Sequence, residues 1–302
     1  MSLHKSVLLK EAIDGLDLRA GDIYLDATLG SGFHMEEVWR RSGGKVSLFG
    51  IDVDQMSLDI AKSNLDLSQV PARMARLNFR NIERAPKLLD MGEPSKILFD
   101  LGWNTPQFDT PEGELGRGFS FQKDEPLLMT LESKVLEGDT TAYDVVNSWG
   151  EENLADVIYG YGEERYARRI AKAIVERRKE KPILSSKELA DLVKSVVPIF
   201  YRFGRIHPAT KTFQAIRIAV NDELRALEDG LHGAFKILRE NGRIAVISFH
   251  SLEDRIVKNF FKNKKEELKA KIINKKPITP SEVEISANPR SRSAKLRIIQ
   301  KL

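Results

Sequence analysis

The 302-residue chain contains no cysteine, no apolar run long enough for a membrane-spanning helix, and no cluster with metal-ligand spacing. Without cysteine it can form no disulfide, bind no metal through thiolate and use no thiolate nucleophile. The absence of disulfides fits the reducing cytoplasm, where we expect the protein to act. Apolar residues make up 41% and charged residues 30% of the chain, which is typical of a soluble globule with one large domain or two smaller ones.

The net charge is only +4, but the basic residues are unevenly distributed. From Arg255 to the C-terminus the chain has fourteen Lys and Arg against four Asp and Glu, so the remainder is slightly acidic. A second basic stretch extends from Arg165 to Lys181. Such segments bind phosphate backbones, although either one alone could be an ordinary solvated surface. Nucleic acid is therefore a candidate partner.

The most informative segment is residues 26–34, Asp-Ala-Thr-Leu-Gly-Ser-Gly-Phe-His. It follows a short apolar run that predicts a buried strand, and it precedes a predicted helix at residues 35–41. A strand, a glycine turn and a helix are typical of a nucleotide-binding corner, in which Gly30 and Gly32 allow a tight turn and close approach of a ligand. The next predicted strand ends at Asp52, about twenty residues beyond the glycines, where such folds place a carboxylate on ribose hydroxyls.

This corner departs from a dinucleotide site. Phe33 or His34 stands where a third glycine would bring a pyrophosphate to the helix N-terminus, and the Asp26 carboxylate would repel a phosphate. A carboxylate at the head of the loop suits a ligand with an ammonium or sulfonium group, which points to S-adenosylmethionine. Asp26 could instead only cap the turn through its own backbone.

Alternating strand and helix patterns predict a parallel α/β sheet. A third strand, residues 96–100, ends at Asp100. Because ligands of such sheets bind at the carboxyl ends of the strands, Asp26, Asp52 and Asp100 should converge on one crevice. Residues 140–198 have an all-helical pattern, which predicts a helical insertion. The expected domains are a first sheet part over 1–110, an inserted helical domain over 111–206, and a second sheet part with a basic tail over 207–302.

The second half of the chain carries further local predictions. Residues 209–227 and 230–239 predict two separate helices, and residues 243–249 predict a buried strand. Ser251 is the expected N-cap of the helix that follows this strand. The segment from 272 onward is expected to be irregular until a closing strand at 295–299.

Past the third strand, residues 100–109 place polar side chains before a proline. This resembles the Asn/Asp/Ser-Pro-Pro-aromatic loop of amino-methyltransferases, which methylate exocyclic amines of adenine or cytosine. Such an amine is a poor nucleophile, and two acceptors that grip its N–H groups would direct its lone pair at a methyl donor, so catalysis is largely positioning. Asp100 or Asn104 and a carbonyl near Pro106 are candidates for this grip, and a plain strand-exit turn is the alternative.

These segments and others together resemble the bacterial 16S ribosomal RNA (cytosine-N4) methyltransferases of the MraW/RsmH type. The matching segments cover nearly the whole chain and include residues 4–9, 26–30, 50–54, 100–102, 117–121, 161–165, 207–210, 220–224, 247–255 and 288–293. The resemblance implies a Rossmann-like S-adenosylmethionine-dependent methyltransferase sheet with an inserted all-helical domain. It also implies a target cytidine in the decoding centre of 16S rRNA.

The cofactor contacts implied by the resemblance are Gly32, Phe33, His34, Asp52, Phe79, Asp100 and Gln107, to which the glycine corner adds Asp26 and Gly30. Several departures from the family lie on the acceptor side. Phe33 replaces a glycine, residues 103–105 replace Val-Ser-Ser, and Leu128 and Thr130 replace an acid and an arginine.

His250, between a strand end and a helix, could relay a proton or simply hold its loop. The candidate phosphate contacts are Arg165, Arg168, Arg169, Arg290 and Arg292.

The sequence leaves three functions open: a ribosomal RNA base methyltransferase, a DNA amino-methyltransferase, and a non-catalytic RNA-binding relative. A DNA enzyme would normally need a domain that reads base edges, and the sequence shows no known motif of that kind. The expected partner is therefore 16S rRNA or the small ribosomal subunit. Either a monomer or a homodimer is compatible with the sequence.

Overall fold

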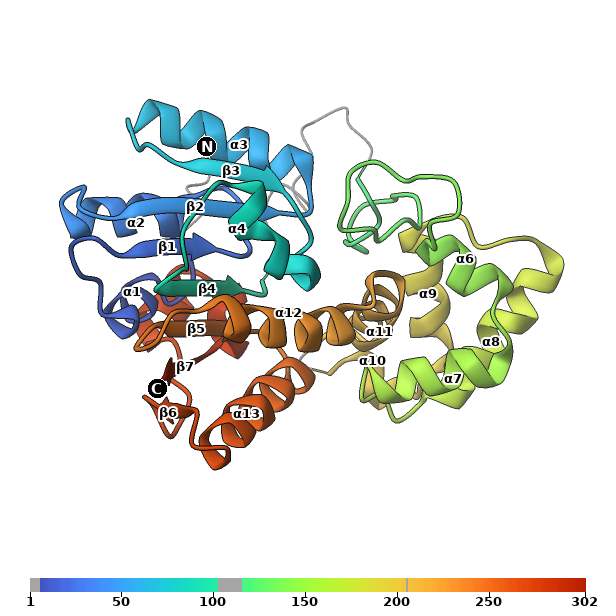
Figure 1. Ribbon diagram of the computed structural model, residues 1–302. Helices are drawn as coiled ribbons and strands as arrows, with labels where there is room; N and C mark the ends of the chain where they lie inside the picture. Colours follow the sequence, from blue (N-terminus) through green and yellow to red (C-terminus); the bar gives the residue numbers. More distant parts are fainter. Residues whose placement is uncertain (1–5, 103–115, 205) are drawn as a thin grey trace. The chain divides into compact units, whose positions relative to one another are not determined.

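The computed structural model describes residues 6–102, 116–204 and 206–302 (Figure 1). The chain divides into two compact units: residues 1–104 with 224–302, here called the sheet unit, and residues 105–223, here called the helical unit. The expected boundaries lay at 110 and 206. The second one differs from the observed division because α11 (Thr210–Asn221) packs against helices of the insertion.

One seven-stranded sheet forms the sheet unit, in the order β3-β2-β1-β4-β5-β7-β6. The five strands from β3 to β5 are parallel, β7 is antiparallel to β5, and β6 is antiparallel to β7. The strand order reverses between β1 and β4, which is where ligands of open α/β sheets bind. The predicted parallel α/β sheet is confirmed. The strands are β1 (Ile23–Asp26), β2 (Ser47–Asp52), β3 (Arg73–Arg76), β4 (Lys96–Asp100), β5 (Arg243–Ser248), β6 (Ala270–Ile272) and β7 (Lys295–Lys301).

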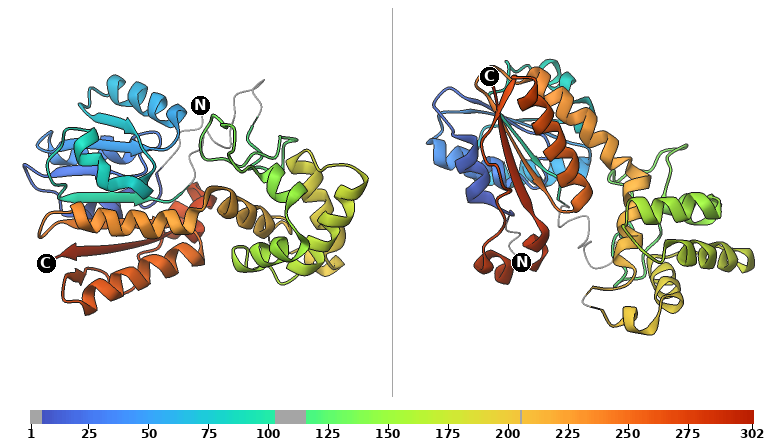
Figure 2. Two further views of the ribbon diagram at one scale, coloured as in Figure 1. Left: turned by 45° about the vertical axis from the view of Figure 1, so that its right-hand side comes forward. Right: turned by 90° about the horizontal axis from the view of Figure 1, so that it is seen from below.

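Helices cover both faces of this sheet, and each face has its own apolar core (Figure 2). Alternate residues of a strand supply opposite faces, so Tyr24 and Leu98 belong to one core while Leu25, Ile97 and Phe99 belong to the other. The first face carries α1 (Leu9–Leu16), α2 (Phe33–Ser42) and α3 (Gln55–Leu67), and the second carries η1 (Phe79–Arg84), α4 (Ala85–Leu88), α12 (Glu223–Ile237) and α13 (Ser251–Glu266).

Two sequence predictions for residues 209–239 are wrong. Residues 209–227 do not form one helix, because Asp222 adopts a left-handed backbone conformation with φ 47° and separates α11 from α12. Residues 230–239 do not begin a new helix, since α12 runs through Gly230 to Ile237. The basic C-terminal segment is also more regular than expected: it contains α14 (Glu282–Ala287), η2 (Pro289–Ser293) and a seven-residue β7.

The helical unit is held by buried apolar residues on the facing sides of its helices. Leu154 and Ile158 of α7 and Ile170 and Ile174 of α8 are fully buried. The helices are α6 (Ala142–Ser148), α7 (Glu151–Gly160), α8 (Ala167–Glu180), α9 (Ser186–Val196), α10 (Ile199–Arg202) and α11. In the described part of the chain, no helix combines the length and apolarity needed to cross a bilayer.

A buried ionic cluster lies where β1 and β4 begin. The Asp22 side chain is 1% exposed and accepts from Arg239 Nη2 at 2.7 Å and from the Arg19 backbone N–H at 2.7 Å. Lys96 Nζ, also buried, lies 3.6 Å from Asp22 Oδ2. Removing one partner of a buried ion pair leaves an uncompensated charge in a low-dielectric region.

We therefore expect Asp22→Ala to lower the free energy of unfolding by about 3–5 kcal/mol, because Lys96 would lose its buried counter-charge. Urea denaturation at pH 7 measures this loss, with the exposed Asp66→Ala as the matched control. A loss below about 1 kcal/mol, the usual range for a surface pair, would contradict the assignment.

Candidate active site at the carboxyl ends of the strands

Three carboxylates end three neighbouring strands at the point where the strand order reverses. Asp26 of β1 pairs in register with Gly50 of β2 and with Leu98 of β4. Asp52 and Asp100 each lie two residues farther along those neighbouring strands, on the same carboxyl edge of the sheet. The structure thus brings together the three side chains that the sequence placed in one crevice.

The glycine loop after β1 is fastened to the end of β2. Gly30 N donates to Asp52 Oδ2 at 2.8 Å, and the Asp54 backbone N–H donates to Asp52 Oδ1 at 2.9 Å. Gly30 and Gly32 have φ values of 56° and 84°, and a Cβ on Gly32 would lie 3.3 Å from Leu65 Cγ. Each Asp52 oxygen keeps a further lone pair, so this carboxylate can still accept hydroxyl hydrogen bonds from a ligand.

Asp26 makes the turn-capping contact that the sequence left open as its alternative role. Its Oδ1 accepts from the Thr28 backbone N–H at 3.1 Å, and its Oδ2 accepts from the buried Tyr24 hydroxyl at 3.0 Å. Thr28 Oγ1 in turn accepts from the Asp100 backbone N–H at 2.6 Å, which ties the loop after β1 to the end of β4. Sequence reasoning did not identify either Tyr24 or Thr28, because side-chain bonds between strand ends have no local sequence signal.

Burial, with a smaller contribution from the Asp52 carboxylate, raises the pKa of Asp26 to about 7. Burial likewise raises the pKa of Asp100 to about 7, with Asp26 adding to the effect, and the pKa of Asp52 to about 6. His34 Nδ1, at the start of α2, lies 3.8 Å from Asp100 Oδ2. A cationic ligand at this edge would favour the ionised carboxylates, whereas a phosphate would be repelled by them.

Phe79 and Phe33, two predicted ligand contacts, occupy segments that begin beside this edge. The Leu77 backbone N–H donates to Asp52 O at 2.9 Å, and η1 then begins at Phe79. The half-buried Phe79 ring packs edge-on against Phe99, with 5.8 Å between ring centroids. Phe33 is half-buried at the first residue of α2, directly after Gly32.

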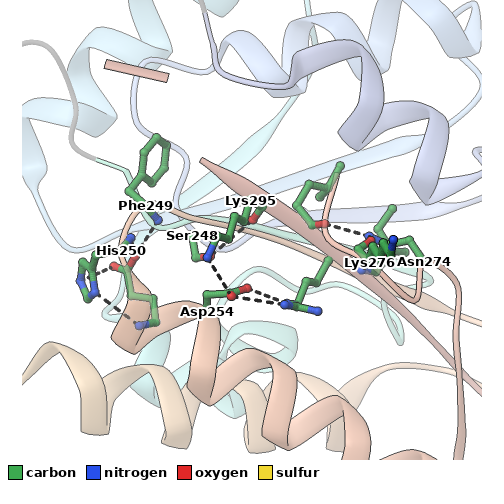
Figure 3. A network of polar contacts seen from close by, with 11 residues as sticks. Ser248, Phe249, His250, Asp254, Asn274, Lys276 and Lys295 are labelled. Atoms are coloured by element: carbon green, nitrogen blue, oxygen red, sulfur yellow. Dashed lines mark hydrogen bonds and ion pairs between the residues drawn. The ribbon is translucent and has the colours of Figure 1, made fainter. Parts of the chain in front are cut away.

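His250 is the N-cap of α13, so the prediction that Ser251 caps this helix is wrong. His250 has an extended backbone with φ −138°, and its Nδ1 accepts from the Glu253 backbone N–H at 3.4 Å. Glu253 Oε2 accepts from the backbone N–H groups of Phe249 and His250 at 2.8 and 3.2 Å (Figure 3). Of the two roles that the sequence left open for His250, this geometry supports holding the loop.

The remaining predicted residues fall into two groups. Asn104, Pro106 and Gln107 lie outside the described residues, so the predicted amine-gripping loop is not described. The five candidate RNA contacts are all exposed: Arg165, Arg168 and Arg169 at or in the first turn of α8, and Arg290 and Arg292 in η2.

Comparison with known proteins gives a family match over the whole chain. A family model described as the MraW methylase family matches residues 1–302. The ribosomal RNA small subunit methyltransferase H of Sulfurihydrogenibium sp. (strain YO3AOP1) is 46% identical over 295 residues, covering 98% of each chain. Its counterpart in Paenibacillus sp. (strain JDR-2) is 43% identical over 323 residues, covering 100% of both. A solved rRNA methylase from Streptococcus thermophilus is 10% identical with a TM-score of 0.45, covering 99% of each chain.

The raised pKa of Asp26 predicts a pH-dependent stability. Between the ordinary pKa of 3.8 and about pH 7 the unfolded chain releases this proton while the folded protein keeps it. Asp26 therefore lowers the free energy of unfolding as the pH rises through this window, and the loss is complete above about pH 7, where the carboxyl is ionised in both states. Asp26→Asn keeps the contacts to Thr28 and Tyr24 without the charge. We expect the ligand-free variant to match the wild type near pH 4 and to exceed its free energy of unfolding by about 1–3 kcal/mol near pH 8.

Urea denaturation across this pH range measures the difference, with the exposed Asp59→Asn as control. A variant less stable than the wild type at pH 8 would show that the ionised Asp26 carboxylate stabilises the fold, contrary to this account.

Proposed function

The chain belongs to the MraW methylase family, and from this premise we propose that it transfers a methyl group from S-adenosylmethionine to the N4 amine of a cytidine in small-subunit ribosomal RNA. The curated relatives are named as ribosomal RNA small subunit methyltransferases. These names favour an RNA substrate over DNA and an enzyme over a non-catalytic relative. The partner is then 16S rRNA or the small ribosomal subunit, in the cytoplasm.

The observation that carries this proposal is the set of three carboxylates at the β1/β4 edge, of which Asp26 and Asp52 are buried and Asp100 is half-buried. Their negative charge suits a ligand that combines an adenosine with a positively charged sulfur and has no phosphate. Asp52 retains lone pairs that would accept from the ribose hydroxyls, and we propose that the Phe79 ring lies against the adenine. When bound, S-adenosylmethionine supplies an electrophilic methyl group on its sulfonium.

Asp100 has the position of an acceptor for the target amine. It ends β4, and Gly102 N donates to its Oδ1 at 3.4 Å. A Cβ on Gly102 would lie 2.6 Å from Phe249 Cε2, so a larger residue at this position would require the Phe249 ring to shift. An Asp100 oxygen that accepts an N–H of the cytosine amine would turn the nitrogen lone pair toward the methyl group. Because burial brings the Asp100 pKa to about 7, this carboxylate can also take the proton that the methylated nitrogen releases.

The absence of cysteine decides between two positions on the cytosine. Methylation at ring carbon 5 ordinarily needs a thiolate that adds at carbon 6, and this chain has none. Methylation of the exocyclic amine needs no covalent intermediate, only a gripped amine aligned with the donor. The proposed product is therefore N4-methylcytidine.

For the donor site, we expect Asp52→Ala to weaken S-adenosylmethionine binding about tenfold or more, since two ribose hydroxyls lose a charged acceptor worth roughly 1.5–3 kcal/mol. Isothermal titration calorimetry measures the change. Asp52→Asn, which keeps one acceptor oxygen, should lie between Ala and wild type, and Asp59→Ala on the exposed side of α3 is the control. Unchanged affinity in Asp52→Ala would remove Asp52 from the donor site.

For the reaction, the protein is incubated with isotopically labelled S-adenosylmethionine and small-subunit particles, free rRNA or DNA, followed by digestion to nucleosides and mass spectrometry. We expect labelled N4-methylcytidine from the ribosomal substrates. Recovery of 5-methylcytidine, of a ribose methyl group, or of label in DNA alone would refute the proposal.

In the same assay, Asp100→Asn tests the acceptor. We expect kcat to fall by about tenfold or more, because one oriented acceptor with charge is lost at the reacting amine. Filter binding of rRNA should be unchanged. If rRNA affinity falls in parallel with kcat, Asp100 serves substrate binding and not the transfer step.

A further inference from the structure

The basic stretch from Arg165 to Lys181 divides into two halves with different surroundings. In the second half, Arg177, Arg178 and Lys179 make contacts within the protein. Arg177 Nη2 pairs with Glu188 Oε1 at 2.6 Å, and Lys179 Nζ pairs with Glu176 Oε1 at 3.0 Å. Arg178 donates to the backbone carbonyls of Val146 and Trp149 at 2.7 and 2.6 Å. The Arg177 and Arg178 contacts fasten α8 to its neighbours, so these two arginines are structural.

The first half of the stretch is different. Arg165, Arg168, Arg169 and Lys172 are all exposed, and no carboxylate in the described ranges pairs with any of them. Four cations therefore face solvent over two turns at the start of α8 without local charge compensation. Such a row attracts phosphate groups.

Aromatic rings lie directly beside this row. The Arg165 guanidinium lies 4.8 Å from the centroid of Tyr166, 4.9 Å from that of Tyr201 and 5.7 Å from that of Phe200. Phe200 and Phe203 are 69% and 81% exposed, and Ile199 is 69% exposed. With a spacing of three residues around the single turn of α10, Phe200 and Phe203 lie on one side of it. Large apolar side chains this exposed mark an interaction surface.

The turn that carries these rings is held in place from both sides. Tyr201 Oη donates at 2.6 Å to Glu164, which is fully buried and also accepts from the Tyr166 backbone N–H at 2.9 Å. Arg202 donates to the carbonyls of Ser195 and Val197 at 2.6 and 3.0 Å, which ties α10 to the end of α9. The exposed rings are therefore pre-organised, and a partner would lose little free energy to ordering them.

We propose that Phe200, Phe203 and the Arg165 guanidinium form a stacking platform for unpaired RNA bases, with Arg168, Arg169 and Lys172 on the adjoining phosphates. This rests on the proposed function and assigns its RNA-binding surface within the helical unit. Aromatic rings and arginine planes stack on bases that are not paired, while neighbouring cations follow the backbone. A second copy of the chain is a poorer occupant, since a two-fold contact through this patch would bring two sets of the same four cations together.

The test uses the full-length protein and a short, unstructured single-stranded RNA, with binding followed by fluorescence anisotropy at several salt concentrations. Phe200→Ala with Phe203→Ala should weaken binding by at least about fivefold per ring, without changing the salt dependence, because rings displace no counterions. Arg168→Gln with Arg169→Gln should instead reduce the slope of log affinity against log salt by roughly 1.4. The control is Leu184→Ala, another exposed apolar residue of the helical unit (59%).

Two further measurements separate the platform from the proposed function. Calorimetry should give wild-type S-adenosylmethionine affinity for the ring variant, which shows that the sheet unit is intact. If that variant binds the single strand and methylates rRNA like the wild type, the platform is refuted while the proposed methylation stands. If the wild type transfers no methyl group to rRNA but the rings are still needed for RNA binding, the proposed function fails and the platform is supported.

Sedimentation velocity tests the alternative that a second copy of the chain binds to this patch. A wild-type dimer that dissociates in the ring variant, with single-strand affinity unchanged, would identify the patch as a contact between copies and overturn the platform. Equal loss of affinity for fully paired RNA and for the single strand would also overturn it, because a paired base cannot lie on the rings.

Discussion

The site depends on one electrostatic constraint: three carboxylates lie together at the carboxyl edge of β2, β1 and β4, with Asp26 and Asp52 buried and Asp100 half-buried. Parallel pairing fixes their spacing, and backbone donors from the glycine loop hold two of them in place. Burial makes ionisation costly, which is why the pKa values of Asp26 and Asp100 rise to about 7. Such an edge excludes phosphate ligands and suits a positively charged one. The proposed use of a sulfonium methyl donor rests on the combined charge of these three carboxylates and not on any single contact.

The two units contribute different chemistry. The sheet unit holds the donor side, where glycines, backbone amides and buried acids leave little freedom. The helical unit presents cations and rings that are exposed and fixed, with part of its basic stretch used to fasten α8 and part left facing solvent. In the basic stretch from Arg165 to Lys181, the cations that contact neighbouring elements are therefore structural. The four exposed cations at the start of α8, without a carboxylate partner in the described ranges, are the ones proposed to bind RNA.

Much of the sheet was predictable from sequence, because apolar runs that end in an acid repeat three times and parallel strands share a carboxyl edge. The short strands β3 and β6 were not predicted, since β3 (Arg73–Arg76) has no apolar alternation and β6 (Ala270–Ile272) is too short for its alternation to be recognised. The break at Asp222 was missed because an aspartate in a left-handed conformation leaves no pattern in the chain. His250 as an N-cap and the pairing of Arg177 with Glu188 depend on three-dimensional contacts, so composition alone could not assign them. Asn104, Pro106 and Gln107, on which the acceptor-side prediction depends, lie outside the described residues.

The most direct test of the charge argument compares two ligands that differ at the sulfur. S-adenosylmethionine carries a sulfonium, whereas S-adenosylhomocysteine has a neutral thioether in the same place. Their affinities for the wild-type protein are measured by calorimetry between pH 5.5 and 8.5. Because the buried carboxylates ionise as the pH passes through about 6 to 7, the preference for the sulfonium over the thioether should increase across that range. A preference that is constant or falls with rising pH would contradict the account.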